Sequence, residues 1–320
     1  MECQAENKFL TFLTGLLGHD PKQLDTFLLW FRGIHFDKAR PRQCLVIAGE
    51  AGCGKSLLQK IITHTLGGRT AKPYSFLTGR TEFNSDLFGA EHLIIDDESA
   101  STAYRSRENL GNQIKQIVAV AEHRLHAKGK DAMTLCPWWV LTISLNDEPE
   151  NLMVLPRIEP SLEDKIILLQ GKKSQLPMPT DTGEQRLLFW EALIAGVRDL
   201  LKKLAEIYPQ GRYVSGRFVV KSYHHPSILR ALKSLSKEEQ LRELIDIIIK
   251  FPRTLSAKEL EGLVRKEAPK QADRLFTFDA ACGSLLGRLA KEYPHRIKNA
   301  RTGTARLWKI YPLESEKNQS

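Results

Sequence analysis

The feature that most constrains this chain is a short apolar segment that runs directly into a glycine-rich loop and then into a helical segment. Residues 44–48 (CLVIA) have strand character, the loop 49–56 reads GEAGCGKS, and residues 57–66 show helical spacing before two glycines. The loop matches G-x-x-x-x-G-K-[ST] without deviation, in the strand-loop-helix context that the pattern requires. This combination predicts an α/β sheet built around the loop. The alternative is a glycine-rich turn that matches by chance.

The residue types of this loop suit the binding of a polyphosphate. Glycines let backbone amides approach phosphate oxygens, and the following helix N-terminus adds its dipole. In such a loop Lys55 reaches the β- and γ-phosphates, and the Ser56 hydroxyl coordinates Mg²⁺. We therefore predict binding and hydrolysis of ATP with Mg²⁺. The residues expected to line the nucleotide are Gly49, Glu50, Ala51, Gly52, Cys53, Gly54, Lys55, Ser56 and Leu57.

A second apolar segment, residues 92–95, ends in the consecutive acids Asp96, Asp97 and Glu98. A buried strand that delivers carboxylates at its end suits the magnesium and water side of a triphosphate site. The preferred register uses Asp96 for Mg²⁺ and Asp97 as the base that activates water. The shifted register uses Asp97 for the metal and Glu98 as the base. An acidic loop that caps the next helix is the alternative without chemistry.

A third apolar segment, residues 138–145, ends in Asn146. Three such segments separated by helical stretches predict a parallel sheet that is covered on both faces. An amide at this position could orient the attacking water without carrying charge. The alternative for Asn146 is an ordinary turn residue.

The stretch just before this third segment, residues 122–131, is rich in basic residues around Gly129. It predicts a hairpin tip on which Arg124, Lys128 and Lys130 could contact the phosphate backbone of a nucleic acid. A solvated charged turn is the alternative.

The charge of the chain also favours a polyanionic partner. The net charge is +9, and residues 286–311 contain seven Lys or Arg but a single acid, Glu292. No apolar run approaches the about 18 to 20 residues of a membrane span, and the N-terminus does not read as a secretory signal. The five cysteines lack paired or metal-ligand spacing, so a cytoplasmic location is expected and a disulfide framework or metal cluster is not.

The remaining segments read mainly as helices. The N-terminal residues form two helical stretches interrupted by Gly18 and Pro21, and Ser236 and Ser256 open capping-box patterns. Helices followed by a basic hairpin, residues 296–298 and 306–310, indicate a winged helix. The expected divisions are an N-terminal helical segment (1–40), an ATPase core (41–170), a linker (171–185), a helical region (186–252), a winged-helix-like domain (253–312) and a tail (313–320).

The order of these motifs resembles the superfamily 3 helicases, the AAA+ replication ATPases of small viruses, phages and plasmids. The similarity is greatest to the helicase half of phage and plasmid primase-helicase proteins, and it covers about residues 9–170. It implies an AAA+-like P-loop sheet and a hexameric ring that moves on single-stranded or forked DNA. The family's Lys-Gly-Lys hairpin signature falls on Lys128, Gly129 and Lys130.

The chain departs from the family pattern where an arginine finger is expected. Arg157 is the nearest arginine, whereas Lys165 stands closer to the expected place. A lysine supplies charge but lacks arginine's planar fork, so both assignments stay open. The about forty residues ahead of the core hold no primase domain, so any priming is expected from a separate protein.

The leading hypothesis is therefore an ATP-dependent DNA helicase or translocase with catalytic residues Lys55, Asp97, Glu98, Asn146 and Arg157. The alternative is an ATP-regulated switch, a replication loader or a defence-system ATPase, that binds DNA or protein without unwinding. A third hypothesis makes the winged helix the working part and the ATPase its scaffold.

Overall fold

The computed structural model describes residues 6–37, 42–96, 104–208, 217–218, 220–302 and 305–312. It divides into two compact units, Met1–Leu232 and Lys233–Ser320. Within the described residues, no helix has both the length and the apolar character that crossing a bilayer requires.

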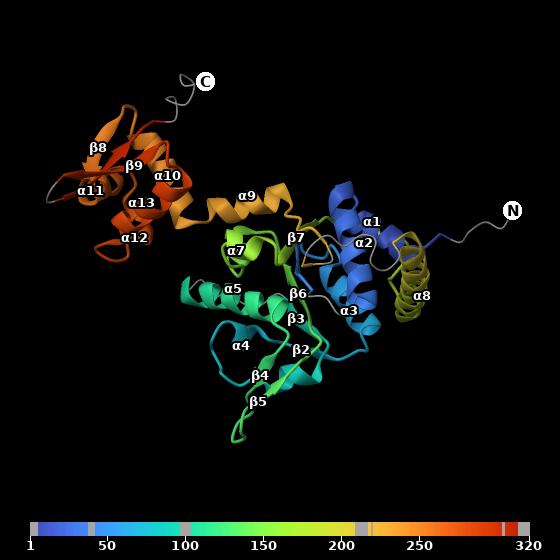
Figure 1. The fold of residues 1–320 in the computed structure, drawn as a ribbon. Coiled ribbons are helices and arrows are strands. Elements are labelled where there is room, and N and C mark those ends of the chain that lie inside the picture. Colours follow the sequence, from blue (N-terminus) through green and yellow to red (C-terminus); the bar gives the residue numbers. More distant parts are fainter. Residues whose placement is uncertain are drawn as a thin grey trace. The chain divides into compact units, whose positions relative to one another are not determined.

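The centre of the first unit is a five-stranded parallel sheet with the order β2-β3-β6-β1-β7 (Figure 1). Every residue of β1 and β6 is buried, which explains why most of their side chains are apolar. In the register, Val46 faces Ile143 on one side and Leu168 on the other. The predicted α/β class with a parallel sheet is confirmed. The strands are β1 (Cys44–Gly49), β2 (Thr70–Ala71), β3 (His92–Asp96), β6 (Val140–Leu145) and β7 (Ile166–Gly171).

Helices cover both sides of this sheet. α3 (Lys55–Thr65) contacts β1, β3 and β6, and Figure 1 shows it on the opposite side from α5 (Tyr104–Ala119). Leu58, Ile61 and Ile62 place the apolar stripe of α3 in the core. The shorter elements are α4 (Tyr74–Leu77), a 3-10 turn (Ser85–Gly89), α6 (Pro149–Leu152) and α7 (Pro160–Glu163).

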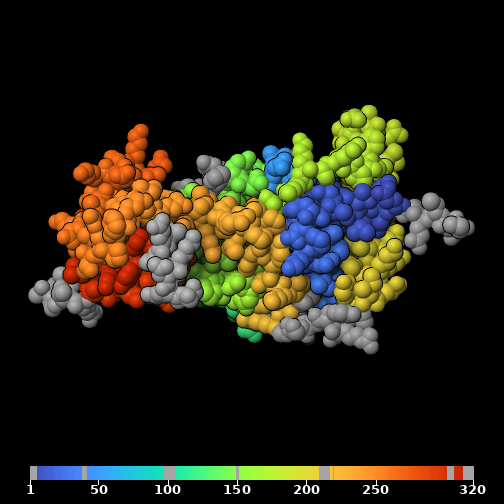
Figure 2. Space-filling view, turned by 90° about the horizontal axis from the view of Figure 1, so that it is seen from above, coloured from blue at the N-terminus to red at the C-terminus, as the bar shows by residue number. Residues whose placement is uncertain are grey.

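Three further helices share the core on the α3 side. They are α1 (Lys8–Leu17), α2 (Pro21–Phe36) and α8 (Gly183–Ile207), and Figure 2 shows the blue N-terminal helices against the yellow segment of α8. A Cβ at Gly196 would lie 3.0 Å from the backbone nitrogen of Phe9, so only glycine allows α8 to approach α1 this closely. The Asn7 side-chain amide donates to the Gly196 carbonyl at 2.8 Å.

The start of α2 is set by a proline and a capping carboxylate. The two predicted helices are separate, and Pro21 is the first residue of the second one. A residue without an N–H is tolerated there because the first amides of a helix have no partner within it. The Asp20 carboxylate caps the helix by accepting from the Lys22 amide at 2.9 Å.

The second unit has helices beside a three-stranded antiparallel sheet with the order β8-β10-β9. The predicted hairpin is confirmed, as are the helix starts at Ser236 and Ser256, and the arrangement is that of a winged helix. The structure places α10 in this unit and α8 in the first, whereas the sequence analysis grouped both in residues 186–252. The elements are α10 (Lys237–Ile248), β8 (Arg253–Ser256), α11 (Ala257–Glu267), α12 (Pro269–Leu275), α13 (Ala281–Glu292), β9 (Ile297–Thr302) and β10 (Ala305–Ile310), and α9 (Pro226–Ser234) precedes them.

Candidate functional site

The glycine-rich loop joins the carboxyl end of β1 to the first residue of α3, as the sequence predicts. Gly54 has a φ of +109°, and a Cβ there would lie 2.9 Å from the Phe12 ring. At Gly49 a Cβ would lie 2.1 Å from the carbonyl oxygen of Gly171 on β7. Glycine is therefore required at both ends of the turn, by backbone conformation and by close neighbours.

Lys55 lies inside the loop with its side chain directed at neutral oxygens. The residue is 5% exposed, and its ammonium donates to the carbonyls of Gly49 at 2.8 Å and Glu50 at 2.9 Å, and to Asn146 Oδ1 at 3.0 Å. None of these partners carries a charge, although a buried ammonium is most stable beside an anion. The contact with Asn146 brings the end of β6 to the loop.

The N-terminus of α3 completes this cradle. No side chain of the described residues caps it, so its first amides remain available to a ligand. A buried ammonium and free amides at a helix N-terminus together fit a phosphate group.

A hydroxyl and a carboxylate lie side by side next to Lys55. Ser56 Oγ donates to Asp96 Oδ1 at 3.2 Å, and the Ser144 hydroxyl on β6 donates to the same oxygen. Hydroxyl and carboxylate oxygens are the hard ligands that Mg²⁺ prefers. Of the two registers, this contact favours Asp96 as the metal-side acid. Asp97 and Glu98 lie outside the described residues, so their roles stay predictions.

A series of buried polar side chains supports the carboxylate of Asp96. Ser144 Oγ also contacts Gln59 Oε1 at 3.1 Å, and Gln59 Nε2 donates to Thr142 Oγ1 at 2.9 Å. Gln59, Thr142 and Ser144 are at most 2% exposed. Sequence reasoning missed these residues because they interrupt apolar segments without forming a motif. The signal was their polarity within segments that are otherwise buried.

This series of buried polar contacts ends at the side chain of His92. The imidazole of His92 lies between the hydroxyls of Thr63 at 2.7 Å and Thr142 at 2.8 Å. Burial lowers the pKa of His92 to about 3, so the ring is neutral at physiological pH. This side chain was predicted only as part of an apolar strand.

The predicted basic hairpin is present in the first unit. β4 (His123–Leu125) pairs antiparallel with β5 (Met133–Leu135), and Figure 1 shows the pair extending away from the sheet. Lys128 and Lys130 are exposed at its tip beside Gly129, whose φ is +71°, and Arg124 is exposed on β4. The hairpin therefore presents three cations to solvent, and their contact with nucleic acid stays a prediction.

Asn84 fixes the base of this hairpin. The residue is 4% exposed, its Nδ2 donates to the Arg124 carbonyl at 2.9 Å, and its Oδ1 accepts from the His126 amide at 2.7 Å. The Asn84 amide also donates to the His126 carbonyl at 3.1 Å. One side chain thus satisfies backbone groups on β4 and at its end.

The two candidates for a finger residue lie on either side of α7. Arg157 is exposed in the segment between α6 and α7. The Lys165 ammonium donates to the Ser161 carbonyl at 2.9 Å and to the Asp164 carboxylate at 2.6 Å. Lys165 is therefore engaged within its own chain.

Comparison with known proteins supports this fold. Residues 47–157 match a protein family described as a family of unknown function (DUF5906). No curated protein matches the chain. The apo A form of the NrS-1 C-terminal region aligns with a TM-score of 0.59 and 13% identity over 96% of this chain and 76% of that one. A second apo structure of that region gives 0.57 and 15% over 95% and 75%. At these identities the likeness establishes a shared fold.

Proposed function

We propose that this protein is an ATP-driven DNA helicase or translocase of the superfamily 3 type. The observation that carries the proposal is the convergence of Lys55, the uncapped start of α3 and the Ser56–Asp96 pair at the carboxyl ends of β1 and β3, the two strands that flank β6. In an open parallel sheet this edge is where ligands bind.

Each group of the site has a defined task in this proposal. The loop amides and Lys55 bind the β- and γ-phosphates, and Lys55 exchanges neutral acceptors for anionic ones as ATP enters. Ser56 and Asp96 hold Mg²⁺, which when bound neutralises charge on the phosphates.

The remaining catalytic roles concern water and the neighbouring subunit. Once Lys55 turns to phosphate, the Asn146 amide is released to orient the attacking water, with Asp97 or Glu98 as its base. In a ring, Arg157 or Lys165 supplies the finger, and the planar guanidinium of Arg157 matches phosphate geometry better than the ammonium of Lys165 does.

The exposed hairpin supplies the contact with nucleic acid. Lys128 and Lys130 are exposed at the tip of the β4–β5 hairpin, whose base is fixed by Asn84. Their charges can therefore contact the phosphates of a DNA strand in the channel of a ring. We propose single-stranded or forked DNA as the substrate.

ATP hydrolysis with and without single-stranded DNA tests this function. We expect DNA to stimulate the rate several-fold, and we expect the ratio of the two rates to fall to about one in Lys128→Ala/Lys130→Ala, because DNA engagement depends on the phosphate contacts. The matched control is Lys202→Ala/Lys203→Ala, which removes two exposed lysines from α8.

Two outcomes would contradict the proposed helicase or translocase activity. A hydrolysis rate of the wild-type protein that DNA does not change would favour the ATP-regulated switch. Equal loss of stimulation in the α8 control would show that the hairpin has no special role.

A further inference from the structure

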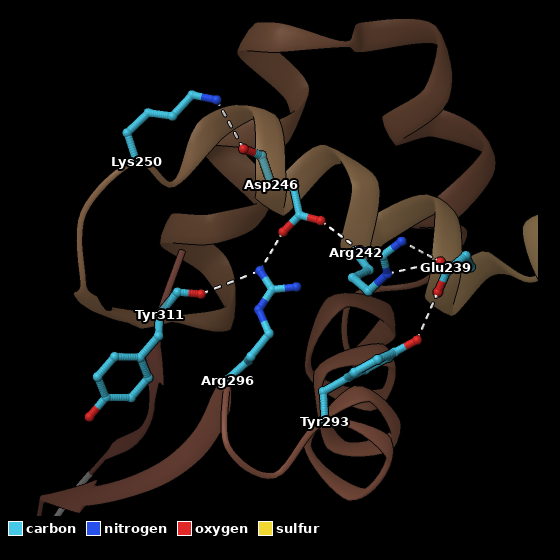
Figure 3. A network of polar contacts seen from close by, with 7 residues as sticks. All are labelled: Glu239, Arg242, Asp246, Lys250, Tyr293, Arg296 and Tyr311. Atoms are coloured by element: carbon cyan, nitrogen blue, oxygen red, sulfur yellow. Dashed lines mark hydrogen bonds and ion pairs between the residues drawn. The ribbon is translucent and has the colours of Figure 1, made fainter. Parts of the chain in front are cut away.

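Two arginines of the second unit are neutralised by carboxylates of α10. Figure 3 shows that Arg242 pairs with Glu239 and with Asp246, the latter at 2.6 Å, and that Arg296 pairs with Asp246. The carbonyl of Tyr311 also accepts from Arg296, at 3.4 Å, whereas the Tyr311 ring points away from this network. These arginines stabilise the unit, so a ligand for its remaining positive charge must bind elsewhere.

The β8-β10-β9 sheet has one face in the core of the unit and one open face. Trp308 of β10 points into the core and is 1% exposed. Neighbouring residues of a strand point to opposite faces, so Lys309 and Tyr311 belong to the open face, together with Lys298, which pairs with Lys309. Both lysines are exposed, and Tyr311 is half-buried. A Cβ at Gly287 of α13 would lie 3.9 Å from the Trp308 ring, so α13 packs on the other side of the sheet from these lysines.

The two lysines of the open face repel each other. Lys309 lies directly opposite Lys298 in the ladder between β10 and β9, and like charges at such positions destabilise a sheet. Neither ammonium forms an ion pair with a carboxylate in the described part of the chain. Both lie near the ring of Tyr311, with Lys298 Nζ 5.6 Å and Lys309 Nζ 5.3 Å from its centroid. An anionic ligand would relieve this repulsion, so the open face fits a polyanion.

An exposed aromatic ring lies at one end of the same sheet. Ile310 pairs with Arg253, the first residue of β8, so Tyr311 and the residues just before β8 lie at this end. Phe251, two residues before β8, is 75% exposed. Exposed rings beside cations are typical of surfaces that bind single strands, because any base can stack on them. In a duplex the bases are already stacked and paired, so such a ring has less to bind.

We propose that the open face of the β8-β10-β9 sheet binds single-stranded nucleic acid. Lys298 and Lys309 bind phosphates, and bases stack on Phe251. This surface is distinct from the hairpin lysines of the first unit and lies across the sheet from α13. Its contacts are to phosphates and to the faces of bases, so binding is independent of sequence, falls with salt and requires neither ATP nor Mg²⁺.

Binding of a fluorescent thymidine oligonucleotide of about 15 residues, measured without nucleotide, tests the proposal. The starting protein is the full chain with Lys128→Ala/Lys130→Ala, which removes the lysines of the first unit that are proposed to contact DNA. In this protein we expect Lys298→Glu/Lys309→Glu to weaken the affinity at least about tenfold at moderate salt, because phosphate contacts are replaced by repulsion.

Two further comparisons separate the named surface from charge in general. Lys266→Glu/Lys270→Glu makes the same charge change at exposed positions of α11 and α12, and it should weaken the affinity much less. Phe251→Ala should weaken the affinity roughly fivefold or more because a stacking partner is lost, whereas Phe251→Trp keeps a ring and should retain the affinity. Because Phe251 is exposed, neither change disturbs the core.

Several results would overturn the proposal. They are the absence of single-strand binding by the starting protein, unchanged affinity in Lys298→Glu/Lys309→Glu or in Phe251→Ala, and equal weakening in the α11–α12 control. A duplex whose affinity falls as much as that of the single strand in Lys298→Glu/Lys309→Glu would also overturn it, because the effect would then be one of charge alone. The ATPase proposal is unaffected by each of these results, since it is tested by hydrolysis.

Discussion

The carboxylate of Asp96 is held by hydroxyl groups from two different elements, Ser56 on α3 and Ser144 on β6. The Ser144 hydroxyl also lies 3.1 Å from Oε1 of buried Gln59 on α3, so the orientation of this carboxylate depends on the packing of α3 on the sheet. Such support lowers the reorganisation needed when a metal binds. The orientation of Asp96 therefore depends on residues that lie outside the acidic motif.

The buried His92 predicts a specific dependence of stability on pH. Its pKa is about 3 in the folded protein and near 6.5 when unfolded, so below pH 6.5 the unfolded chain gains a proton that the native state does not. Its contribution to stability is therefore present above pH 6.5 and is lost as the pH falls toward 3. Between pH 7.5 and pH 5 this loss amounts to about 2 kcal/mol.

Denaturant unfolding of the wild-type protein and His92→Gln at these two pH values measures the effect. We expect the change in unfolding free energy between the two pH values to be smaller in His92→Gln by about 2 kcal/mol. An identical pH dependence in both proteins would show that His92 is protonated in the folded state.

Residue-level prediction from the sequence was strongest where a motif fixes spacing. The positions of Lys55, Ser56 and Asp96 follow from the loop and the strand, and the structure brings them together. Gln59 and Ser144 could not be assigned, because their role arises only when α3 lies across β3 and β6. Only tertiary packing brings these polar side chains into the hydrogen-bonded series that supports Asp96.

At the scale of elements, the β4–β5 hairpin is held by Asn84 rather than by a large apolar face. Met133 is 55% exposed and Leu135 is 40% exposed, so little of β5 is buried. A two-stranded hairpin alone is marginally stable in water. The hydrogen bonds of Asn84 are therefore important for holding the tip lysines in position.

Replacing Asn84 should loosen this hairpin. In Asn84→Ala the His126 amide loses its acceptor, and we expect its hydrogen-exchange protection to fall at least about tenfold, which corresponds to about 1.4 kcal/mol. The control is Asn109→Ala. This variant removes the hydrogen bond from the Asn109 side chain on α5 to the carbonyl of Thr78, the residue that follows α4. Unchanged protection of His126 in Asn84→Ala would refute the role of this side chain.

Some elements could not be predicted from local pattern. β8 is four residues long and begins with two exposed residues, and it is a strand because it pairs with β10. α12 is short and starts at Pro269 without a side-chain cap. In contrast, the capping box at Ser256 is formed in full, because its two hydrogen bonds lie within four residues.

At the scale of the whole molecule, the sheet order explains why distant motifs meet. β6 lies between β1 and β3, so Asn146 and Asp96 flank the end of the glycine-rich loop although they are far apart in sequence. The sequence predicts parallel strands but not their order, which depends on the crossover helices. The second unit has a separate core.

Titration calorimetry with a slowly hydrolysed ATP analogue, with and without Mg²⁺, tests the central claim most directly. We expect binding that Mg²⁺ strengthens and that Lys55→Ala weakens about 10- to 100-fold, since a charge-assisted contact is lost. Lys60→Ala, an exposed lysine of the same helix, should bind as the wild-type protein does. Binding that is absent, indifferent to Mg²⁺ or equally weakened in both variants would contradict the account.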